Sequence, residues 1–260
     1  MIERTITAVV LLAVVIGALF LDPTGWAVKV LVIAIAFVAG HELGTITKSP
    51  IPNLIPGLLV GYMVIAWGSQ PDAILPLMYA VLSAPFLIFA VAKDKKYLAL
   101  GAGTIWICAT LLPFYILAST KFPAAWPLLM TAAIPIWCGD TAAIFVGKAF
   151  GKHKMAPEIS PKKTWEGAAG NFLACIAAAM ILGAILHYPI LPMILLGLNC
   201  GILGQAGDLF ESWLKRKADM KDSGNILPGH GGILDRIDSL MATAPLSLLI
   251  LQVLVIPGKP

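Results

Sequence analysis

Charged residues are scarce in this chain. Only 12% of its 260 residues are Asp, Glu, Lys or Arg, 59% are hydrophobic, and the mean hydropathy is +0.89. Soluble globular domains carry roughly a quarter charged residues, so this composition excludes an ordinary soluble domain. It also excludes a disordered chain, and four cysteines are too few for a disulfide-stapled secreted module. The remaining class is a membrane protein with several spans.

Several motifs of well-known enzyme classes are also missing. There is no phosphate-binding loop of the Walker type, and His41-Glu42 begins the zinc motif H-E-x-x-H without its second histidine. His230 and Asp235 have the H-x-x-x-x-D spacing of some glycerolipid acyltransferases. We discount this match because two residues coincide often by chance. The cysteines form no C-x-x-C pair, and we expect small buried hydrophobic residues at Cys108, Cys138, Cys175 and Cys200.

Apolar runs long enough to cross a bilayer recur along the chain. A spanning helix needs about 20 predominantly apolar residues. Proline, glycine and polar residues separate most of the runs, and no small-residue cleavage site follows the first. We therefore predict an all-α polytopic membrane protein with about nine transmembrane helices. The predicted spans are 5–21, 27–43, 54–68, 73–92, 98–118, 124–147, 167–187, 190–206 and 237–256.

The positions of Lys and Arg predict the orientation, because these residues prefer cytoplasmic loops. With the amino terminus inside, 15 of the 18 basic residues lie in inner segments. Only Lys29, Lys121 and Lys259 lie outside. We therefore predict an amino terminus inside, a carboxyl terminus outside, and a multi-pass protein of the cell inner membrane whose polar loops face the cytoplasm.

The chain divides into an N-terminal group of weakly specified spans, 1–123, and a C-terminal region, 124–260, with long inner loops at 148–166 and 207–238. The second loop holds six of the 14 acidic residues and five basic ones. Acidic residues do little for topology, so these need another explanation. The charged residues of this loop are Asp208, Glu211, Lys215, Arg216, Lys217, Asp219, Lys221, Asp222, Asp235, Arg236 and Asp238.

The first inner loop contains a candidate anion site. Ser160-Pro161 predicts the start of a helix, with Ser as the cap and Pro in the first turn. Lys162 and Lys163 would then lie beside unpaired backbone N–H groups, an arrangement suited to a phosphate or an anionic headgroup. The alternative is that these lysines only enforce topology and contact anionic lipid.

Two carboxylates are expected at or within the membrane. Asp208 follows an apolar run directly, and Asp140 lies well inside a predicted span. Such groups are costly unless paired or bound to a cation, so both are functional candidates, although a hydrogen-bonded structural role remains open for Asp140. After Asp208, Glu211 and Lys215 are four residues apart and can pair on one helical face, and we expect this helix to end at 223–225.

A glycine-dense segment follows at 227–232. Such a segment cannot be a regular helix, and it lets backbone N–H groups converge on an anion. Asp235 and Asp238 come next and share one helical face. Carboxylates, basic residues and a glycine loop are the components of a site for a Mg²⁺-bridged polyphosphate.

These segments resemble one known family. The runs SWLKR at 212–216, KDSG at 221–224 and LPGHGGILDRID at 227–238 closely resemble the signature of phosphatidate cytidylyltransferases, also called CDP-diacylglycerol synthases. GDTAA at 139–143 and SPKKTWEG at 160–167 resemble a second block of the same family. The resemblance implies a bacterial-type membrane enzyme of about nine helices, acting as a homodimer in the lipid bilayer.

The resemblance also implies an activity and a site. The enzyme would condense CTP with phosphatidic acid to give CDP-diacylglycerol and pyrophosphate, with no nucleic-acid partner. Asp208 and Asp235 would bind Mg²⁺, with a second cation left open. The implied catalytic residues are Asp208, Asp235, Lys221, Arg236 and Asp238. The implied substrate-binding residues are Asp140, Lys162, Lys163, Lys215, Arg216, Asp222, His230, Gly231 and Gly232.

Two alternatives stay open. A CTP-dependent lipid kinase or an ether-lipid synthase would use similar polar loops, and the product of the transfer distinguishes them. A transporter or channel would use intramembrane acids as coupling sites. Against a transporter, the charges gather in two inner loops rather than at mid-span.

Overall fold

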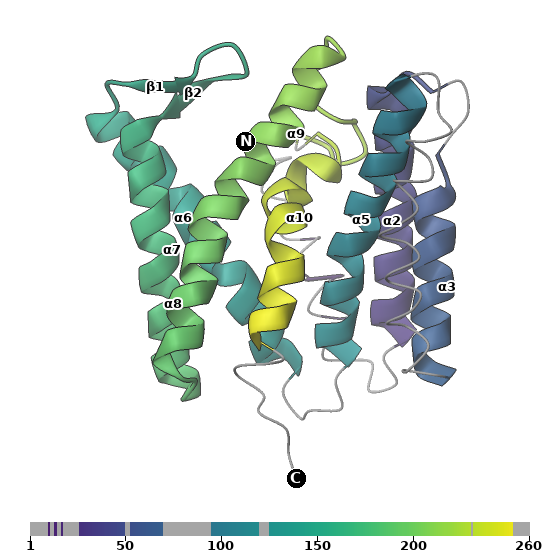
Figure 1. The fold of residues 1–260 in the computed structure, drawn as a ribbon, viewed down its shortest axis with the longest axis horizontal. Coiled ribbons are helices and arrows are strands. Elements are labelled where there is room, and N and C mark those ends of the chain that lie inside the picture. The colour runs from purple at the N-terminus through teal and green to yellow at the C-terminus, as the bar shows by residue number, and fades with distance from the viewer. Residues whose placement is uncertain are drawn as a thin grey trace. The chain divides into compact units, whose positions relative to one another are not determined.

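The described part of the chain is almost wholly helical (Figure 1). The computed structural model describes residues 10, 13, 14, 17, 26–49, 53–69, 95–119, 125–229 and 231–251. The predicted span at 73–92 and most of the span at 5–21 lie outside these residues. The helices are α2 (Trp26–Ile46), α3 (Ile55–Ser69), α5 (Lys95–Ser119), α6 (Ala125–Phe150), α7 (Trp165–Leu186), α8 (Ile190–Asn199), α9 (Gln205–Lys217) and α10 (Leu234–Leu249), and the π-helical turn η2 (Cys200–Gly204) joins α8 to α9.

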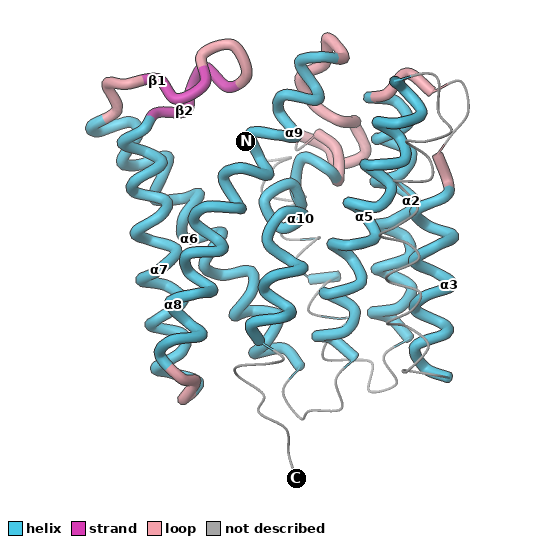
Figure 2. Tube along the Cα trace, in the orientation of Figure 1, coloured by secondary structure: helices cyan, strands magenta, loops and turns pink. Residues whose placement is uncertain are grey.

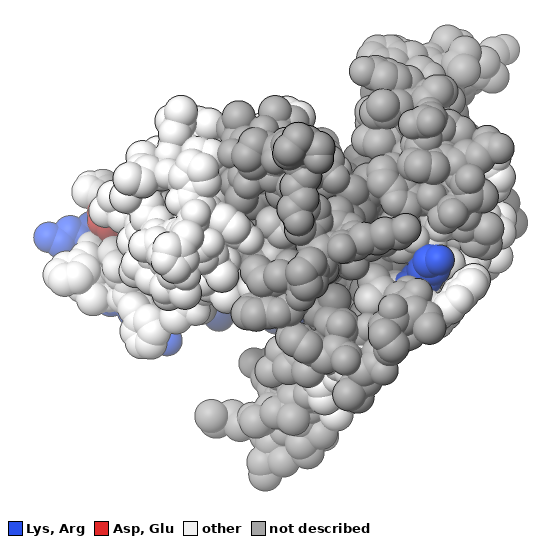
Figure 3. Space-filling model, turned by 90° about the horizontal axis from the view of Figure 1, so that it is seen from below, with Lys and Arg blue, Asp and Glu red and all other residues white. Residues whose placement is uncertain are grey.

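Four of the described helices are long and apolar enough to cross a membrane: Trp26–Ile46, Leu128–Phe150, Trp165–Leu186 and Ile190–Lys217. Many large apolar side chains on α6, α7 and α8 are exposed, as expected for helices that face lipid. Seen from the end opposite the strands, the described residues in view are mostly uncharged (Figure 3). The expectation of an α-helical membrane protein is confirmed, whereas the nine spans and the orientation stay predictions.

A small antiparallel hairpin interrupts the helices between α6 and α7 (Figure 2). Its strands are β1 (Lys154–Ala156) and β2 (Ser160–Thr164). The predicted helix start at Ser160-Pro161 is therefore wrong, because this dipeptide opens a strand. Helix α7 begins at Trp165 instead, and Thr164 caps it: its Oγ1 accepts a hydrogen bond from Gly167 N at 3.1 Å.

Helix α9 is shorter than expected. It ends at Lys217 rather than at 223–225, and Asp219 then adopts a left-handed backbone with φ of 60°. Helical hydrogen bonding cannot continue through that conformation. The segment from 218 to 233 is consequently a loop, and it contains the charged residues Asp219, Lys221 and Asp222.

The chain forms two compact units. The first comprises Met1–Ser119 and Lys217–Ile237, and the second comprises Thr120–Arg216 and Asp238–Pro260. In the first unit α2, α3 and α5 pack against one another. In the second, α7 packs against both α6 and α8. The loop after α9 therefore belongs with the N-terminal helices, although in sequence it interrupts the second unit.

Small residues allow close helix packing in the second unit. A Cβ at Gly197 of α8 would lie 2.6 Å from Ile176 Cα of α7, and one at Gly167 of α7 would lie 2.9 Å from Ala143 O of α6. Such contacts let helix backbones approach closely, as in many membrane proteins. Three of the cysteines are buried as predicted, but Cys138 is exposed, which corrects that expectation.

Candidate functional site

The two predicted polar loops meet within the second unit through Lys163 and Asp208. Lys163 comes from strand β2 and Asp208 from the first turn of α9. Lys163 Nζ lies 2.6 Å from Asp208 Oδ2, and Ser212 Oγ donates to Asp208 Oδ1 at 3.3 Å. About a third or less of each charged side chain is exposed. The hairpin thus places the ammonium group of Lys163 beside Asp208, one of the carboxylates that the sequence makes a functional candidate.

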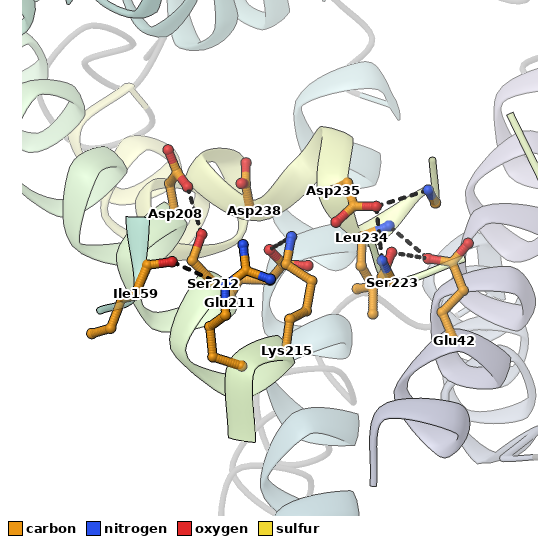
Figure 4. Close-up of polar contacts among 12 residues, drawn as sticks. Glu42, Ile159, Asp208, Glu211, Ser212, Lys215, Ser223, Leu234, Asp235 and Asp238 are labelled. Carbon is orange, nitrogen blue, oxygen red and sulfur yellow. Dashed lines mark hydrogen bonds and ion pairs between the residues drawn. The ribbon is translucent and has the colours of Figure 1, made fainter. Parts of the chain in front are cut away.

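Asp238 of α10 lies beside Asp208 because α9 and α10 touch at a glycine. A Cβ at Gly207 would lie 2.7 Å from Asp238 O and 2.6 Å from Ala242 Cβ. The Asp208 and Asp238 carboxylates point to the same side of their helices (Figure 4). Their negative charges repel each other. This proximity makes the pair suitable for a cation or a proton, either of which relieves the repulsion.

Asp140 of α6 completes an acidic cluster, which we define as Asp140, Asp208 and Asp238. Asn171 Nδ2 of α7 donates to Asp140 Oδ1 at 3.2 Å. The Asp140 carboxylate is exposed on α6 and interacts electrostatically with Asp208, Asp238 and Lys163. Asp140 therefore has a structural hydrogen bond and lies near the charged group around Asp208, and its functional role stays a prediction.

Glu211 and Lys215 form the ion pair that their spacing allowed. Lys215 Nζ lies 2.5 Å from Glu211 Oε2, and the side chains are 10% and 2% exposed respectively. The pairing is confirmed, but the pair is buried rather than at the surface. Buried pairs depend on good geometry because both charges lose water. Arg216, next along, is exposed and donates from Nε to Ile159 O at 3.2 Å, which ties α9 to the hairpin.

Asp235 organises the glycine-dense segment in the first unit. Its Oδ2 accepts hydrogen bonds from Ser223 N at 2.9 Å and from Gly232 N at 2.8 Å. The second bond joins the side chain of Asp235, in the first turn of α10, to the backbone three residues earlier. Gly231 has φ of 81°, and a Cβ there would lie 2.7 Å from Asp235 Oδ2. Only glycine suits this position, because the backbone is left-handed and the carboxylate fills the space.

Three charged signature residues of the first unit are exposed. Lys221, Asp222 and Arg236 are open to solvent, and Gly231 and Leu227 exchange two backbone hydrogen bonds of 3.0 and 3.1 Å that close the turn. His230 lies outside the described residues. Lys221 and Arg236 thus place positive charge at the surface of this unit.

Sequence reasoning missed Glu42 of α2. This carboxylate is only 2% exposed, and it accepts hydrogen bonds from Ser223 Oγ, Ile233 N and Leu234 N at 2.8 to 2.9 Å. The sequence feature that could have revealed it is an acidic residue near the end of a predominantly apolar span. Glu42 also belongs to the incomplete zinc motif, and its partners lie more than 180 residues away along the chain.

The donor set of the acidic cluster suits a hard cation. Carboxylate oxygens are the ligands that Mg²⁺ prefers, and Asp208 already holds the ammonium group of Lys163. Among the residues that the structure describes, no three or more His, Cys, Asp or Glu side chains are arranged as a ready metal site. The two predicted ligands Asp208 and Asp235 belong to different compact units.

Comparisons with known proteins relate the chain to one family. The model of the family described as "Cytidylyltransferase family" matches residues 2–254. Phosphatidate cytidylyltransferase of Haemophilus influenzae is 30% identical over 278 residues, covering 94% of this chain and 96% of that protein.

Other relatives match over just under half of the chain. Phosphatidate cytidylyltransferase of Bacillus subtilis is 51% identical over 116 residues, which are 44% of this chain and 43% of the relative. The protein of the same name from Brucella suis is 44% identical over 128 residues, 48% and 47% of the two chains. The chain thus spans about half the length of these two relatives in the matched segments.

Proposed function

Because the chain belongs to the cytidylyltransferase family, we propose that it condenses CTP with phosphatidic acid to give CDP-diacylglycerol and pyrophosphate. The relative from Haemophilus influenzae, which aligns over 94% of the chain, carries the name phosphatidate cytidylyltransferase. This reaction would be a step of phospholipid biosynthesis, and the enzyme would act as a homodimer in the cell inner membrane with its site facing the cytoplasm.

One observation in the structure carries the proposal: the basic hairpin and the acidic helix α9 meet at Lys163 and Asp208. Both substrates are anions that repel each other, so a site that joins them needs cations. It also needs carboxylates if it is to hold a metal ion. The contact between Lys163 and Asp208, next to Asp238 and Asp140, provides both kinds of group within one unit.

The proposed chemistry is an in-line displacement at phosphorus. A phosphate oxygen of phosphatidate forms a bond to the α-phosphorus of CTP, while the bond from that phosphorus to the bridging oxygen of pyrophosphate breaks. A phosphate monoester is already nucleophilic at neutral pH, so the protein need not supply a strong base. The leaving group departs as pyrophosphate, and its charge needs neutralisation by nearby cations.

We assign the binding of Mg²⁺ to Asp208 and Asp235, with Asp238 beside the former. The ion would neutralise charge on the nucleotide phosphates when bound. Lys162 and Lys163 of the hairpin, and Lys221 and Arg236 of the signature segment, are assigned to the phosphates of the two substrates. Lys215, Arg216, Asp222, His230, Gly231 and Gly232 are retained as further substrate-binding residues.

The test is a transfer assay on the purified full-length protein. CTP labelled in the cytidine is supplied with phosphatidate vesicles and Mg²⁺, and the label is followed into the lipid fraction together with pyrophosphate release. Label in the lipid with one pyrophosphate per turnover supports the proposal. Release of CDP with phosphorylated lipid would instead indicate a lipid kinase and would contradict it.

A matched pair of variants links the activity to the site. Asp208→Asn removes a charge from the acidic cluster, whereas Asp219→Asn removes one from an exposed residue in the loop after α9. Asparagine also tolerates the left-handed backbone at position 219. We expect loss of transfer in the first variant and wild-type transfer in the second.

A further inference from the structure

Glu42 is a buried carboxylate in the first unit, outside every segment that resembles the family signature. It lies near the end of the apolar helix α2, in a part of the chain where the sequence suggested only membrane spans. Placing an ionised carboxylate in such surroundings is costly unless hydrogen-bond donors compensate it. The residues that compensate Glu42 all belong to the loop after α9 or to the start of α10.

Three donors converge on this carboxylate, and Figure 4 labels two of the donor residues, Ser223 and Leu234. Glu42 Oε1 accepts from Ile233 N at 2.9 Å, and Oε2 accepts from Leu234 N at 2.9 Å and from Ser223 Oγ at 2.8 Å. The two backbone donors are N–H groups at the amino end of α10, where a negative charge is also favoured by the helix dipole. Glu42 therefore stabilises the amino end of α10 from outside that helix.

The loop is shaped around this carboxylate. A Cβ at Gly232 would lie 2.5 Å from Glu42 Oε2, and one at Gly224 would lie 2.7 Å from Glu42 Oε1. Real Cβ atoms do not approach oxygen so closely, so any side chain at either position would displace the loop or the carboxylate. The position of Glu42 thus requires glycine at both Gly224 and Gly232 of the signature segment.

Ser223 connects Glu42 to Asp235. Its hydroxyl donates to Glu42 Oε2, while its backbone N–H donates to Asp235 Oδ2 at 2.9 Å. Ser223 is only 1% exposed, so neither bond has water as an easy substitute. Gly232 N holds the same Asp235 oxygen at 2.8 Å, and Gly232 itself lies against Glu42. Movement of Glu42 would therefore change the orientation of the Asp235 carboxylate.

We propose that Glu42 is a positioning residue of the active site: it holds the segment from Ser223 to Leu234 so that Asp235 is presented in one orientation. The catalytic consequence of this proposal rests on the proposed function, whereas the claim that Glu42 holds the loop does not. It assigns a role in the reaction to helix α2, which contributes no residue to the signature.

The structural part is tested by hydrogen–deuterium exchange on the full-length protein in detergent, comparing wild type with Glu42→Gln. Glutamine has the same shape but keeps only one acceptor oxygen, so it cannot satisfy all three donors. Loss of hydrogen bonds to a buried charge corresponds to roughly tenfold or faster exchange, and this acceleration is expected in peptides covering 222–235.

Asn53→Ala is the matched control. Asn53 is 3% exposed, belongs to the same unit, and donates from Nδ2 to Thr104 Oγ1 at 3.1 Å. Its removal weakens the packing of the N-terminal helices without touching the loop bonds described above. Faster exchange at 222–235 in Glu42→Gln but not in Asn53→Ala supports the proposal. Unchanged exchange at 222–235 in Glu42→Gln, or equal acceleration in both variants, would overturn it.

The catalytic part is tested by kinetics on the same preparations. A positioning role predicts that Glu42→Gln lowers kcat by about tenfold or more, while the KM for CTP changes by less than about threefold, since a misplaced carboxylate affects the reaction more than binding. Unchanged kcat despite faster exchange at 222–235 would overturn the catalytic role.

A second variant and a parallel assay of a relative separate failure of this proposal from failure of the proposed function. If Glu42→Gln cannot be recovered as folded protein, Ser223→Ala removes a single donor, and a smaller change of the same kind at 222–235 is expected, while no change there would overturn the proposal. If wild type transfers no cytidylyl group while the relative from Haemophilus influenzae does so in parallel, the proposed function fails. The exchange experiment then still decides whether Glu42 holds the loop.

Discussion

The carboxylates of Asp208, Asp235 and Glu42 have different partners, and these partners indicate different roles. Asp208 holds the ammonium group of Lys163, whereas Asp235 accepts two backbone N–H groups and Glu42 accepts two backbone donors and a hydroxyl. An ammonium group can leave a carboxylate when a stronger cation or a substrate phosphate arrives. Backbone donors cannot leave without unfolding the loop. Asp208 is therefore the exchangeable carboxylate of the three, and Glu42 is a fixed one.

Lys163 provides a prediction at this scale. Lys163→Met keeps the length of the side chain and removes its charge, so Asp208 loses its partner and the substrate phosphates lose a cation. We expect kcat/KM for transfer to fall on the order of 100-fold, as for removal of one electrostatic contact to a transition state. Steady-state kinetics with varied CTP measure this effect.

Lys162→Met is the control for that variant. Lys162 is the neighbouring lysine of the same strand and is exposed. It is expected to contribute less, because exposed charges are screened by solvent. Equal losses in the two variants would show that the hairpin acts only through its net charge, and the specific role given to the Lys163 to Asp208 contact would be wrong.

At the scale of elements, the hairpin and two helix contacts place the charged residues. Strand β2 carries Lys163, and the cap at Thr164 fixes the position at which α7 begins. On the other side, Gly207 allows α9 to touch α10, which brings Asp208 beside Asp238. Asn199 of α8 also contacts α10, since its Nδ2 donates to Thr243 O at 3.0 Å and to Ser247 Oγ at 2.9 Å.

The close contact at Gly207 predicts that a single added methyl group strongly lowers transfer activity. Gly207→Ala would place a Cβ 2.7 Å from Asp238 O, which forces α9 away from α10. Transfer activity is expected to fall by about tenfold or more, because small displacements of catalytic groups are costly. Gly61→Ala is the control, since a Cβ there meets only ordinary contacts at 3.9 Å. Full activity in Gly207→Ala would refute the importance of this contact.

The helix cap predicts an effect on stability. Thr164→Ala removes the hydroxyl that accepts from Gly167 N, and loss of such a cap costs about 1 kcal/mol. The midpoint of thermal unfolding in detergent should fall, whereas Thr164→Ser, which keeps the hydroxyl, should remain close to wild type. A Ser variant as unstable as the Ala variant would mean that packing of the methyl group, rather than the cap, is what matters.

At the scale of the whole molecule, the sequence predicts what depends on local pattern and misses what depends on distant contacts. Hydropathy located α2, α3 and α5 to α8, because lipid-facing helices need long apolar runs. The capping pattern at Ser160-Pro161 predicts a helix because that pattern is local, whereas the strand pairing with 154–156 is not. The loop partners of Glu42 follow it by some 180 to 190 residues, and no local pattern reveals such contacts.

The predicted topology is also a property of the whole chain. An odd number of spans with the amino terminus inside places the carboxyl terminus outside. A green fluorescent protein fused to residue 260 should therefore remain dark in cells, and alkaline phosphatase fused there should be active. A fluorescent and phosphatase-inactive pair of fusions would show that the number of spans is even, or that the orientation is inverted.

The central claim is that the charges gathered around Asp208 transfer a cytidylyl group to phosphatidate. The most direct measurement is the incorporation of cytidine-labelled CTP into lipid by the purified protein with phosphatidate and Mg²⁺, for wild type, Asp208→Asn and Asp219→Asn. We predict labelled lipid and equimolar pyrophosphate for wild type and Asp219→Asn, and a loss of both for Asp208→Asn. Equal labelling in all three proteins would contradict the site, and no labelling by wild type beside an active relative would contradict the function.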